Sequence, residues 1–370
     1  MKLENIKKIK GLDEYFTLGN TGLRVSPLCL GTMTFGTDWG WGSEARTAQE
    51  LYVRYLESGG NFVDTADGYT NGVSEEILGN IIRETQSRDQ IVLATKFTFS
   101  GEPGNANAAG NGRKNIYRAL EGSLRRLKTD YVDLYWLHAW DNVTPVEEVL
   151  STLNDLVRSG KVRHIGLSDT PAWYLTRAQT IAEHRGLETI SALQLEYSLV
   201  ERNIEREHIP AAMEMGIGVC SWSPLASGFL TGKYKKTASG VEGRGRLMTV
   251  KDQGNPIFHK FTDRNFEILG ALVGVSRELG RSPAQVALNW ATKRPGITST
   301  TIGARTMSQL EDNLQCLDFE IPELLHEKLE QLGRPEQVFP YLFFGDEMQA
   351  FLNGEVKIHK TPPWFHHRGR

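Results

Sequence analysis

Four polar residues follow short apolar runs in the first 140 residues of the chain. Asp64 and Tyr69 lie in FVDTADGY, Lys96 lies in IVLATKF, and His138 lies in VDLYWLHAWD. Apolar runs of this length are typical of buried strands, so each side chain should project from a strand end or from the loop after it. An acid, a base, a phenol and an imidazole that meet can pass a proton to a substrate oxygen. The four residues are therefore candidates for one shared active site.

Together these groups would form a device for moving a proton. A Lys96 ammonium held by Asp64 is expected to lower the pKa of the Tyr69 phenol from its ordinary value of about 10. Tyr69 would then act as an acid near neutral pH. His138 would orient a carbonyl oxygen by hydrogen bonding, and the sequence does not decide which tautomer of its imidazole is present. A single Asp or Lys at a strand end is more often part of a structural ion pair than of a catalytic site. The hypothesis therefore depends on the four residues occurring together and in this order.

The elements that must bring these residues together are eight apolar, strand-like runs that alternate with segments of helical periodicity. This alternation predicts a single (β/α)8 barrel domain over residues 1–320, in which strand ends converge at one rim. A doubly wound sheet would carry a G-x-G-x-x-G turn after its first strand, and the chain has none there. The expected strands cover residues 28–31, 61–65, 91–96, 132–138, 162–168, 192–198, 218–223 and 298–303.

Several segments lie outside this repeat. Residues 1–13 are expected to be flexible, and YFTLGNTGLRVSPL predicts a hairpin before the first barrel strand. Long loops follow the third and seventh strands, at 98–112 and 231–260. Residues 321–370 form a C-terminal extension that should pack on the barrel or on a neighbouring subunit, with disorder at its end. Capping boxes are expected at Thr144 and Ser282, each followed by proline.

Composition limits the function classes. The chain has 370 residues, a formal net charge of -3 and 24% charged residues, without the basic excess that nucleic-acid binding requires. Its three cysteines show no CxxC spacing, which argues against a disulfide framework and favours a reducing cytoplasm. No apolar run approaches the length that crosses a bilayer, and the first residues do not resemble a signal peptide. We therefore expect no nucleic-acid partner and no membrane insertion.

Longer stretches of the sequence resemble the aldo-keto reductases, in particular their bacterial aryl-alcohol-dehydrogenase-like and potassium-channel β-subunit-like branch. The matching stretches include LGNTGLRVSPLCLGTMTFG, NFVDTADGYTNGVSEEILG, SLRRLKTDYVDLYWLHAWD, GKVRHIGLSD and SWSPLASGFLTGKY. The resemblance implies that Asp64, Tyr69, Lys96 and His138 form the family's catalytic tetrad. It also implies a nicotinamide cofactor in the barrel mouth, from which a hydride passes to a carbonyl carbon.

The resemblance assigns cofactor contacts as well. Trp222 matches the aromatic that stacks on the nicotinamide, and Ser168 and Gln194 match the groups that hold its carboxamide. Asp169 stands where the family usually has asparagine, so it can accept but not donate; alternatively it belongs to the start of the following helix. The other expected contacts lie in the loops after the seventh and eighth strands: Ser223, Pro224, Leu225, Gly228, Lys233, Gly303, Ala304, Arg305, Gln309 and Asn313.

Arg305 is the expected phosphate partner and favours NADP(H). Gln309 occupies a position where some relatives carry a second arginine, which leaves NAD(H) as an alternative. Aromatic residues at the expected rim predict a pocket for an apolar carbonyl or alcohol substrate. They are Phe35, Trp39, Trp41, Tyr69, Phe97 and Trp140. The sequence leaves open whether the chain forms a homo-oligomer.

Two other functions fit parts of the sequence. In the first, the chain is an NADPH-binding sensor or regulatory subunit, like the channel β subunits it resembles, and catalytic turnover is incidental to its role. A metal-dependent barrel hydrolase would use Asp64, Asp67, His138 and Asp141 as ligands. That reading leaves Lys96 and Tyr69 without a role and lacks a His-x-His pair, so we expect no metal.

Overall fold

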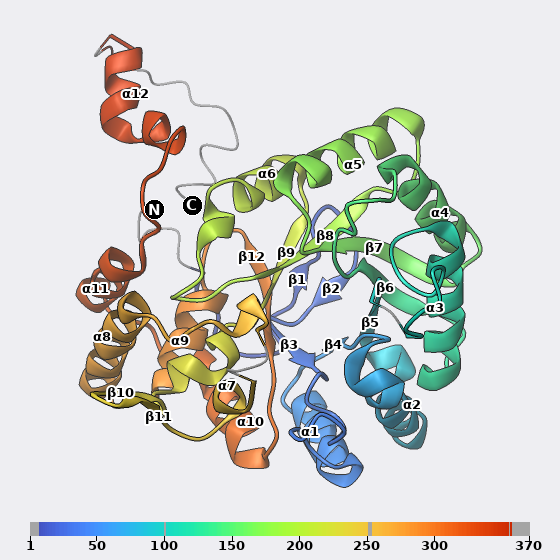
Figure 1. Ribbon diagram of the computed structural model, residues 1–370, viewed down its shortest axis with the longest axis horizontal. Helices are drawn as coiled ribbons and strands as arrows, with labels where there is room; N and C mark the ends of the chain where they lie inside the picture. The colour runs from blue at the N-terminus through green and yellow to red at the C-terminus, as the bar shows by residue number, and fades with distance from the viewer. Residues whose placement is uncertain (1–6, 100, 251–253, 355, 357–370) are drawn as a thin grey trace.

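Eight parallel strands close into a barrel in the computed structural model, which describes residues 7–99, 101–250, 254–354 and 356 (Figure 1). Neighbouring strands are consecutive along the chain, and the last strand pairs with the first. The predicted (β/α)8 barrel is thereby confirmed, with strand ends within two residues of those expected. The barrel strands are β3 (Leu28–Gly31), β4 (Phe62–Asp64), β5 (Val92–Phe97), β6 (Val132–Leu137), β7 (Val162–Ser168), β8 (Ile190–Glu196), β9 (Gly218–Trp222) and β12 (Ile297–Ile302).

Helices surround the barrel on its outside (Figure 1). Each buries apolar residues in the hydrophobic core, as the helical periodicity predicts. The helices between β3 and β9 are α1 (Ala45–Glu57), α2 (Val73–Thr85), α3 (Arg113–Leu127), α4 (Val146–Arg158), α5 (Ala172–Arg185) and α6 (His208–Met215). Those around β12 are α8 (Asp263–Leu279), α9 (Pro283–Thr292) and α10 (Met307–Leu314).

The strand residues alternate between two separate hydrophobic clusters, because successive side chains of a strand point to opposite faces. In β5, Val92 and Ala94 join a cluster inside the barrel, whereas Leu93 and Phe97 pack in the larger cluster beneath the helices. Trp136 of β6 belongs to the inner cluster. This alternation decides which residues at the strand ends face the barrel mouth.

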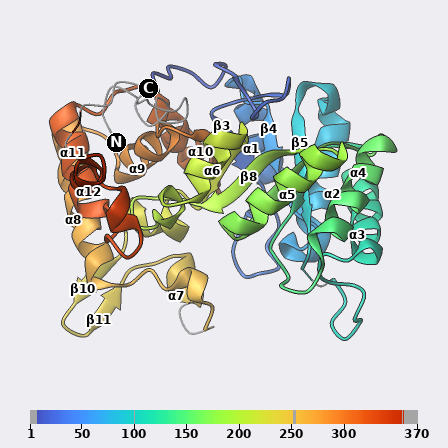
Figure 2. The ribbon, with the colours of Figure 1, turned by 90° about the horizontal axis from the view of Figure 1, so that it is seen from above.

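One end of the barrel is closed by the predicted hairpin, β1 (Phe16–Thr17) and β2 (Arg24–Val25). Leu18 and Val25 of this hairpin belong to the inner cluster. The insertion after β9 contains β10 (Lys235–Thr237), β11 (Gly240–Glu242) and α7 (Arg246–Val250). It projects from the opposite side of the barrel to the N-terminal segment (Figure 2) and follows the carboxyl end of β9, the end at which such barrels carry their sites.

The two expected capping boxes differ in outcome. Ser282 accepts from the Gln285 amide while the Gln285 side chain accepts from the Ser282 amide, which confirms the box at α9. The box at Thr144 is wrong. Helix α4 begins after Pro145 without a side-chain cap, because the Thr144 hydroxyl donates to Asp141 at 2.6 Å instead.

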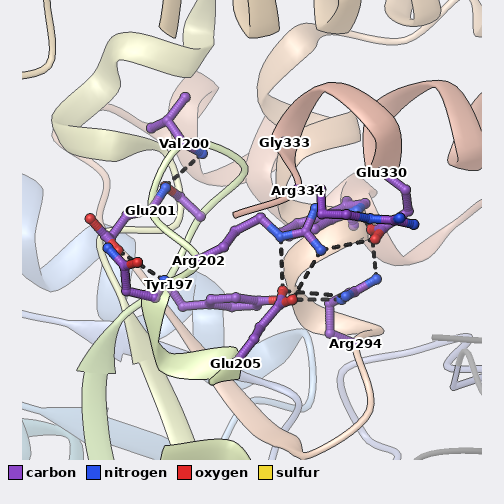
Figure 3. A network of polar contacts seen from close by, with 12 residues as sticks. Tyr197, Val200, Glu201, Arg202, Glu205, Arg294, Glu330, Gly333 and Arg334 are labelled. Atoms are coloured by element: carbon purple, nitrogen blue, oxygen red, sulfur yellow. Dashed lines mark hydrogen bonds and ion pairs between the residues drawn. The ribbon is translucent and has the colours of Figure 1, made fainter. Parts of the chain in front are cut away.

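The chain termini contribute to packing on the barrel. Ile9 and Leu12 are buried, so this part of the segment that we expected to be flexible packs on the core. Helix α11 (Glu323–Gly333) packs against α8, and its Glu330 accepts from Arg202, Trp290 and Arg294 (Figure 3). The predictions for residues 1–6 and for the last residues, 357–370, lie outside the described part of the chain.

Two further observations concern the chain as a whole. Within the described ranges, no helix is both long and apolar enough to span a membrane. Cys29, Cys220 and Cys316 are all buried and unpaired.

Candidate active site

The alternation of the strands places the candidate catalytic residues at the mouth of the barrel. Asp64 follows Phe62 of the inner cluster by two residues, and Lys96 follows Ala94 in the same way. His138 follows Trp136 just beyond β6. Because residues two positions apart in a strand point to the same face, these three side chains face the barrel interior, at the carboxyl end of the strands.

Lys96 is the centre of the polar contacts in this mouth. Its buried ammonium pairs with Asp64 and donates to the Thr65 carbonyl at 2.8 Å and to the Tyr69 hydroxyl at 3.1 Å. Gln194 donates to the second oxygen of Asp64 at 3.2 Å. Asp64 thus holds Lys96 in place, and Lys96 in turn orients the phenol of Tyr69.

The short helical turn after β4 presents Tyr69 to this lysine. It spans Tyr69–Gly72, and Thr70 and Asn71 within it have φ values of 45° and 56°. Left-handed backbone at two consecutive non-glycine residues is unusual and costs free energy. The hydroxyl of Thr70 secures the turn by donating to the Phe35 carbonyl at 3.2 Å and accepting from the Ser74 amide at 3.0 Å.

The ionisation of these groups follows from their burial. Burial lowers the pKa of Lys96, but Asp64 and Tyr69 outweigh it and the net pKa is raised, so the ammonium stays charged. The expected lowering of the Tyr69 pKa is wrong. Burial raises the pKa of the phenol by more than the Lys96 charge lowers it. Tyr69 is therefore fully protonated at neutral pH.

His138 faces Tyr69 across the mouth, with ring centroids 5.9 Å apart in an edge-on arrangement. Burial and then the Lys96 charge hold the pKa of His138 well below its usual range, so the imidazole is neutral. Its buried Nδ1 has no hydrogen-bond partner among the described residues. A neutral imidazole with a free ring nitrogen suits hydrogen bonding to a ligand oxygen.

Asp169 and Trp222 lie together beside the tetrad residues. The Trp222 indole donates to Asp169 at 3.1 Å. Helix α5 begins after Pro171 without a side-chain cap, so Asp169 does not cap that helix. Burial raises the pKa of Asp169 to about 7, even though the bond from Trp222 lowers it. Ser168, at the end of β7, is buried, and its hydroxyl oxygen has no partner among the described residues.

A pocket of about 350 Å³ adjoins these residues between the loops after β9 and β12. Nine of the predicted cofactor contacts line it: Ser223, Pro224, Leu225, Gly228, Lys233, Gly303, Arg305, Gln309 and Asn313. Ala304 does not line it, because that residue is buried and its carbonyl accepts from Thr34 at 2.9 Å. Gln309 accepts from the Arg305 amide at 2.9 Å and so shapes the start of α10.

Three cationic side chains converge on the pocket: Lys233, Arg246 and Arg305. None forms an ion pair within the part of the chain that the structure describes. Burial, and then repulsion from Arg305, lower the pKa of Lys233 and of Arg246, that of Arg246 to about 10. The carboxylate of Asp312 also lines the pocket, but it accepts from Ser282 and Gln285 rather than from these cations. Cations that repel one another and have no carboxylate partner fit an anionic ligand, so the donor set suits a pyrophosphate or phosphate.

A comparison with family models decides the family. The model for the aldo/keto reductase family matches residues 27–334, which include all of these groups. The chain belongs to the aldo/keto reductase family. It is accordingly an NAD(P)H-dependent oxidoreductase of a family that acts on small carbonyl compounds.

Curated relatives of this reductase fit the branch that the sequence indicated. The chain is 39% identical to the oxidoreductase YrpG of Bacillus subtilis, over 85% of this chain and 95% of YrpG. It is 35% identical to a probable voltage-gated potassium channel subunit beta of Oryza sativa, over 88% of this chain and 98% of that protein. It is 32% identical to an NADP(+) aryl-alcohol dehydrogenase of Phanerodontia chrysosporium, over 88% of this chain and 87% of that protein.

Arg246 is a pocket residue of this reductase that sequence reasoning missed. It lies on α7, in the insertion after β9, among several other basic residues of similar spacing. Its guanidinium stacks over the Trp41 ring, 4.0 Å from the centroid. Only the folding of α7 over the pocket distinguishes Arg246 from its basic neighbours, so no local signal could have identified it.

The predicted aromatic residues of the substrate pocket separate into two groups. Trp39 lies 5.6 Å from Trp41 and 6.5 Å from Tyr69, between ring centroids, so these two tryptophans line the approach to the tetrad. Phe35 and Phe97 are fully buried in the hydrophobic core and form no pocket wall. Phe99, which we did not predict, stands edge-on to His138 at 4.6 Å.

Trp140 contributes to a different hollow. It packs against Trp173 at 5.4 Å and lines a second, open pocket of about 250 Å³ near the start of α4 and α5. The reductase mouth that contains Tyr69 is therefore walled by Trp39, Trp41 and Phe99 rather than by the full predicted set.

The metal-hydrolase alternative gains no support from these contacts. The described residues include no group of three or more His, Cys, Asp or Glu side chains placed to hold a metal ion. Asp141, one of the four ligands that this alternative requires, instead accepts from the amides of Asn111, Val143 and Thr144.

Proposed function

We propose that this reductase uses NADPH to reduce an aldehyde or ketone on an apolar or aromatic framework, with Tyr69 as the proton donor. The contact that supports this most directly is the 3.1 Å hydrogen bond from the Lys96 ammonium to the Tyr69 hydroxyl. This bond becomes stronger as the phenol loses its proton, because a phenolate is the better acceptor of a charged donor. Lys96 therefore stabilises the state that forms when the proton leaves.

The protonation states of the tetrad match this role. Tyr69 arrives as a neutral acid, and Lys96 remains charged because Asp64 pairs with it. Neutral His138 lies across the mouth and can donate a hydrogen bond to the same carbonyl oxygen, which positions it for the Tyr69 proton. In the reverse direction, alcohol oxidation, the same phenol oxygen receives the proton.

The pocket beside the tetrad supplies the residues that would hold the cofactor. When bound, the nicotinamide supplies the hydride that reduces the carbonyl carbon. Lys233, Arg246 and Arg305 would neutralise its phosphates, and the buried hydroxyl of Ser168 would pair with a polar group of its ring. Trp222 would cover the ring. Arg305 at the start of α10 favours NADPH, because its guanidinium suits the additional phosphate.

The wall of Trp39, Trp41 and Phe99 favours an apolar or aromatic carbonyl substrate. One of the relatives is named as an aryl-alcohol dehydrogenase, and aryl alcohols are the reduced form of such carbonyl compounds. We therefore propose an aryl or comparably apolar aldehyde as the substrate class, with the corresponding primary alcohol as the substrate of the reverse reaction.

The decisive experiment compares the natural chain with Tyr69→Phe, using a panel of aryl and aliphatic aldehydes. We expect kcat for aldehyde reduction to fall by about 10²–10⁴-fold in the variant, the range for loss of a general acid. The Kd for NADPH, measured by tryptophan fluorescence quenching, should stay within about twofold, because the phenol acts on the transition state. A variant that kept its turnover but bound NADPH poorly would refute the role of Tyr69.

The same panel separates an enzyme from a regulatory subunit. Tight NADPH binding by the natural chain, together with no turnover on any carbonyl, would support the sensor alternative instead. The cofactor preference has its own test, since Arg305→Gln should weaken NADPH binding and leave NADH binding nearly unchanged. Equal losses for both cofactors would place Arg305 at a phosphate that they share.

A further inference from the structure

The segment that follows α11 turns large apolar side chains toward solvent. It contains a short helical turn, Tyr341–Phe344, and α12 (Asp346–Leu352), which lies apart from the barrel helices (Figure 1). We call its apolar side chains the C-terminal apolar surface. This surface comprises Phe339, Leu342, Phe343, Phe344, Phe351 and Leu352, all of them exposed.

Polar contacts attach this segment to the barrel, while its apolar side chains face outward. The Tyr341 hydroxyl donates to Glu207 at 2.6 Å, and the Arg206 guanidinium donates to the Glu336 carbonyl at 2.8 Å. This is the reverse of the usual arrangement, in which apolar groups are packed inward and polar groups face water. This arrangement indicates that the apolar side chains of the segment pack against a second surface.

The segment is also held in one shape before any partner binds. Phe339 and Phe343 meet edge-on at 6.1 Å, and Gln349 of α12 donates to the Phe343 carbonyl at 2.9 Å. In α12, Phe351 and Leu352 follow Met348 at helical spacing, which places the three on one face. A surface that is ordered in advance loses less conformational entropy on association.

The exposed area of the C-terminal apolar surface is close to the area that one partner buries in a standard interface. Phe339 and Phe351 are 76% and 78% exposed, and Phe343 and Phe344 are 38% and 58% exposed. At about 200 Å² for each fully exposed ring, the four phenylalanines contribute roughly 500 Å². With the two leucines the surface reaches roughly 700 Å², above the 300–600 Å² that is usual for the largest patch of a monomer and close to the ~800 Å² that each partner buries in a standard interface.

The composition favours a protein partner over a lipid surface. Residues 335–356 contain four acidic residues and no lysine or arginine, whereas segments that bind anionic membranes are rich in basic residues. Permanent homodimer interfaces have the most apolar composition among protein interfaces, and a two-fold interface requires only one self-complementary patch on each copy. We propose that the C-terminal apolar surface is a homodimer interface, occupied by the same surface of a second copy of this chain.

Sedimentation velocity on the full chain with NADPH tests this proposal. We expect a species of twice the 41.5 kDa chain mass at micromolar concentration. Phe339→Ser combined with Phe351→Ser should convert it to monomer, with an unchanged circular dichroism spectrum. Leu324→Ser is the matched control, because Leu324 is 80% exposed on α11 outside the surface, and this variant should remain a dimer.

Tyr341→Phe provides an independent variant that leaves every apolar side chain in place. Loss of its bond to Glu207 should loosen the segment and raise the dimer Kd several-fold. A monomeric natural chain at tens of micromolar would overturn the proposal, as would a dimer that survives the double phenylalanine substitution. If the full chain is monomeric and dimerises only after truncation behind Val356, then residues 357–370 cover the surface, and the proposal is also wrong. A monomer that binds neutral phosphatidylcholine vesicles would overturn it in favour of a lipid.

Discussion

Replacement of Asp169 with asparagine removes a carboxyl group whose ionisation the fold opposes. Asparagine keeps an oxygen that can accept from the Trp222 indole, and it tolerates the φ of 45° at this position about as well as aspartate does. The substitution therefore changes the charge and little else. We expect Asp169→Asn to be more stable than the natural chain at alkaline pH and nearly equal to it at acid pH.

The sign follows from the two states of the chain. The pKa of Asp169 rises from 3.8 to about 7 in the folded state, chiefly through burial. Between these values the unfolded chain has lost the proton that the folded chain keeps, so the natural protein loses stability as pH rises from about 4 to 7. Three pKa units correspond to about 4 kcal/mol for a fully buried group. Because solvent reaches Asp169, screening reduces the expected loss to about 1–2 kcal/mol.

Urea unfolding of both proteins at pH 5 and pH 8 measures this difference. The free energy of unfolding of Asp169→Asn should exceed that of the natural chain by about 1 kcal/mol more at pH 8 than at pH 5, since most of the titration lies in this interval. Parallel loss of stability in the two proteins over this pH range would show that Asp169 is ionised throughout, and would refute the reasoning.

Three further predictions concern other parts of the chain. Asp141→Asn should cost about 1–2 kcal/mol in urea unfolding at pH 7, because its carboxylate accepts from three amides and the Thr144 hydroxyl. The fold holds its pKa below the usual value, so the difference should shrink as pH falls below about 4. Glu330→Gln should cost about 3 kcal/mol in the same assay, since buried Arg294 loses a charged partner (Figure 3); an unchanged midpoint would contradict this. Arg246→Gln should raise the NADPH Kd about tenfold by fluorescence titration, the ~1.4 kcal/mol of one charged contact, and an unchanged Kd would exclude Arg246 from the cofactor site.

The barrel and the tetrad were predictable because their signals are local in the sequence. Each strand is a short apolar run with turn residues on both sides, and Asp64, Lys96 and His138 stand at the ends of such runs. The period of two within β5 would also have excluded Phe97 from the pocket, because Lys96 points inward and its neighbour must point outward. That error arose from treating every aromatic near a strand end as part of the rim.

Other features depend on contacts between distant segments and were not predictable. Arg246 reaches the pocket only because α7 folds over it and stacks on Trp41, more than 200 positions earlier in the chain. The pKa of Tyr69 depends on the balance between burial and the Lys96 charge, and burial has no sequence signal. Phe99 meets His138 because β5 and β6 pair in parallel with Phe97 beside Leu137, so the residues just beyond the two strands lie side by side.

The distribution of charge separates two tasks within the mouth of the barrel. At the tetrad, the charges of Lys96 and Asp64 pair with each other, and Tyr69 and His138 are neutral. The tetrad therefore has no net charge that would attract an anion, and Tyr69 can still donate its proton. The three unpaired cations lie in the adjoining pocket, where they attract an anion but do not hydrogen-bond the phenol. Substitutions of the cations should therefore change cofactor Kd with kcat largely preserved at saturation, whereas substitutions in the tetrad should change kcat at constant Kd. This division follows from the placement of Asp64, which pairs with Lys96 and so keeps the ammonium charged and fixed where it hydrogen-bonds Tyr69.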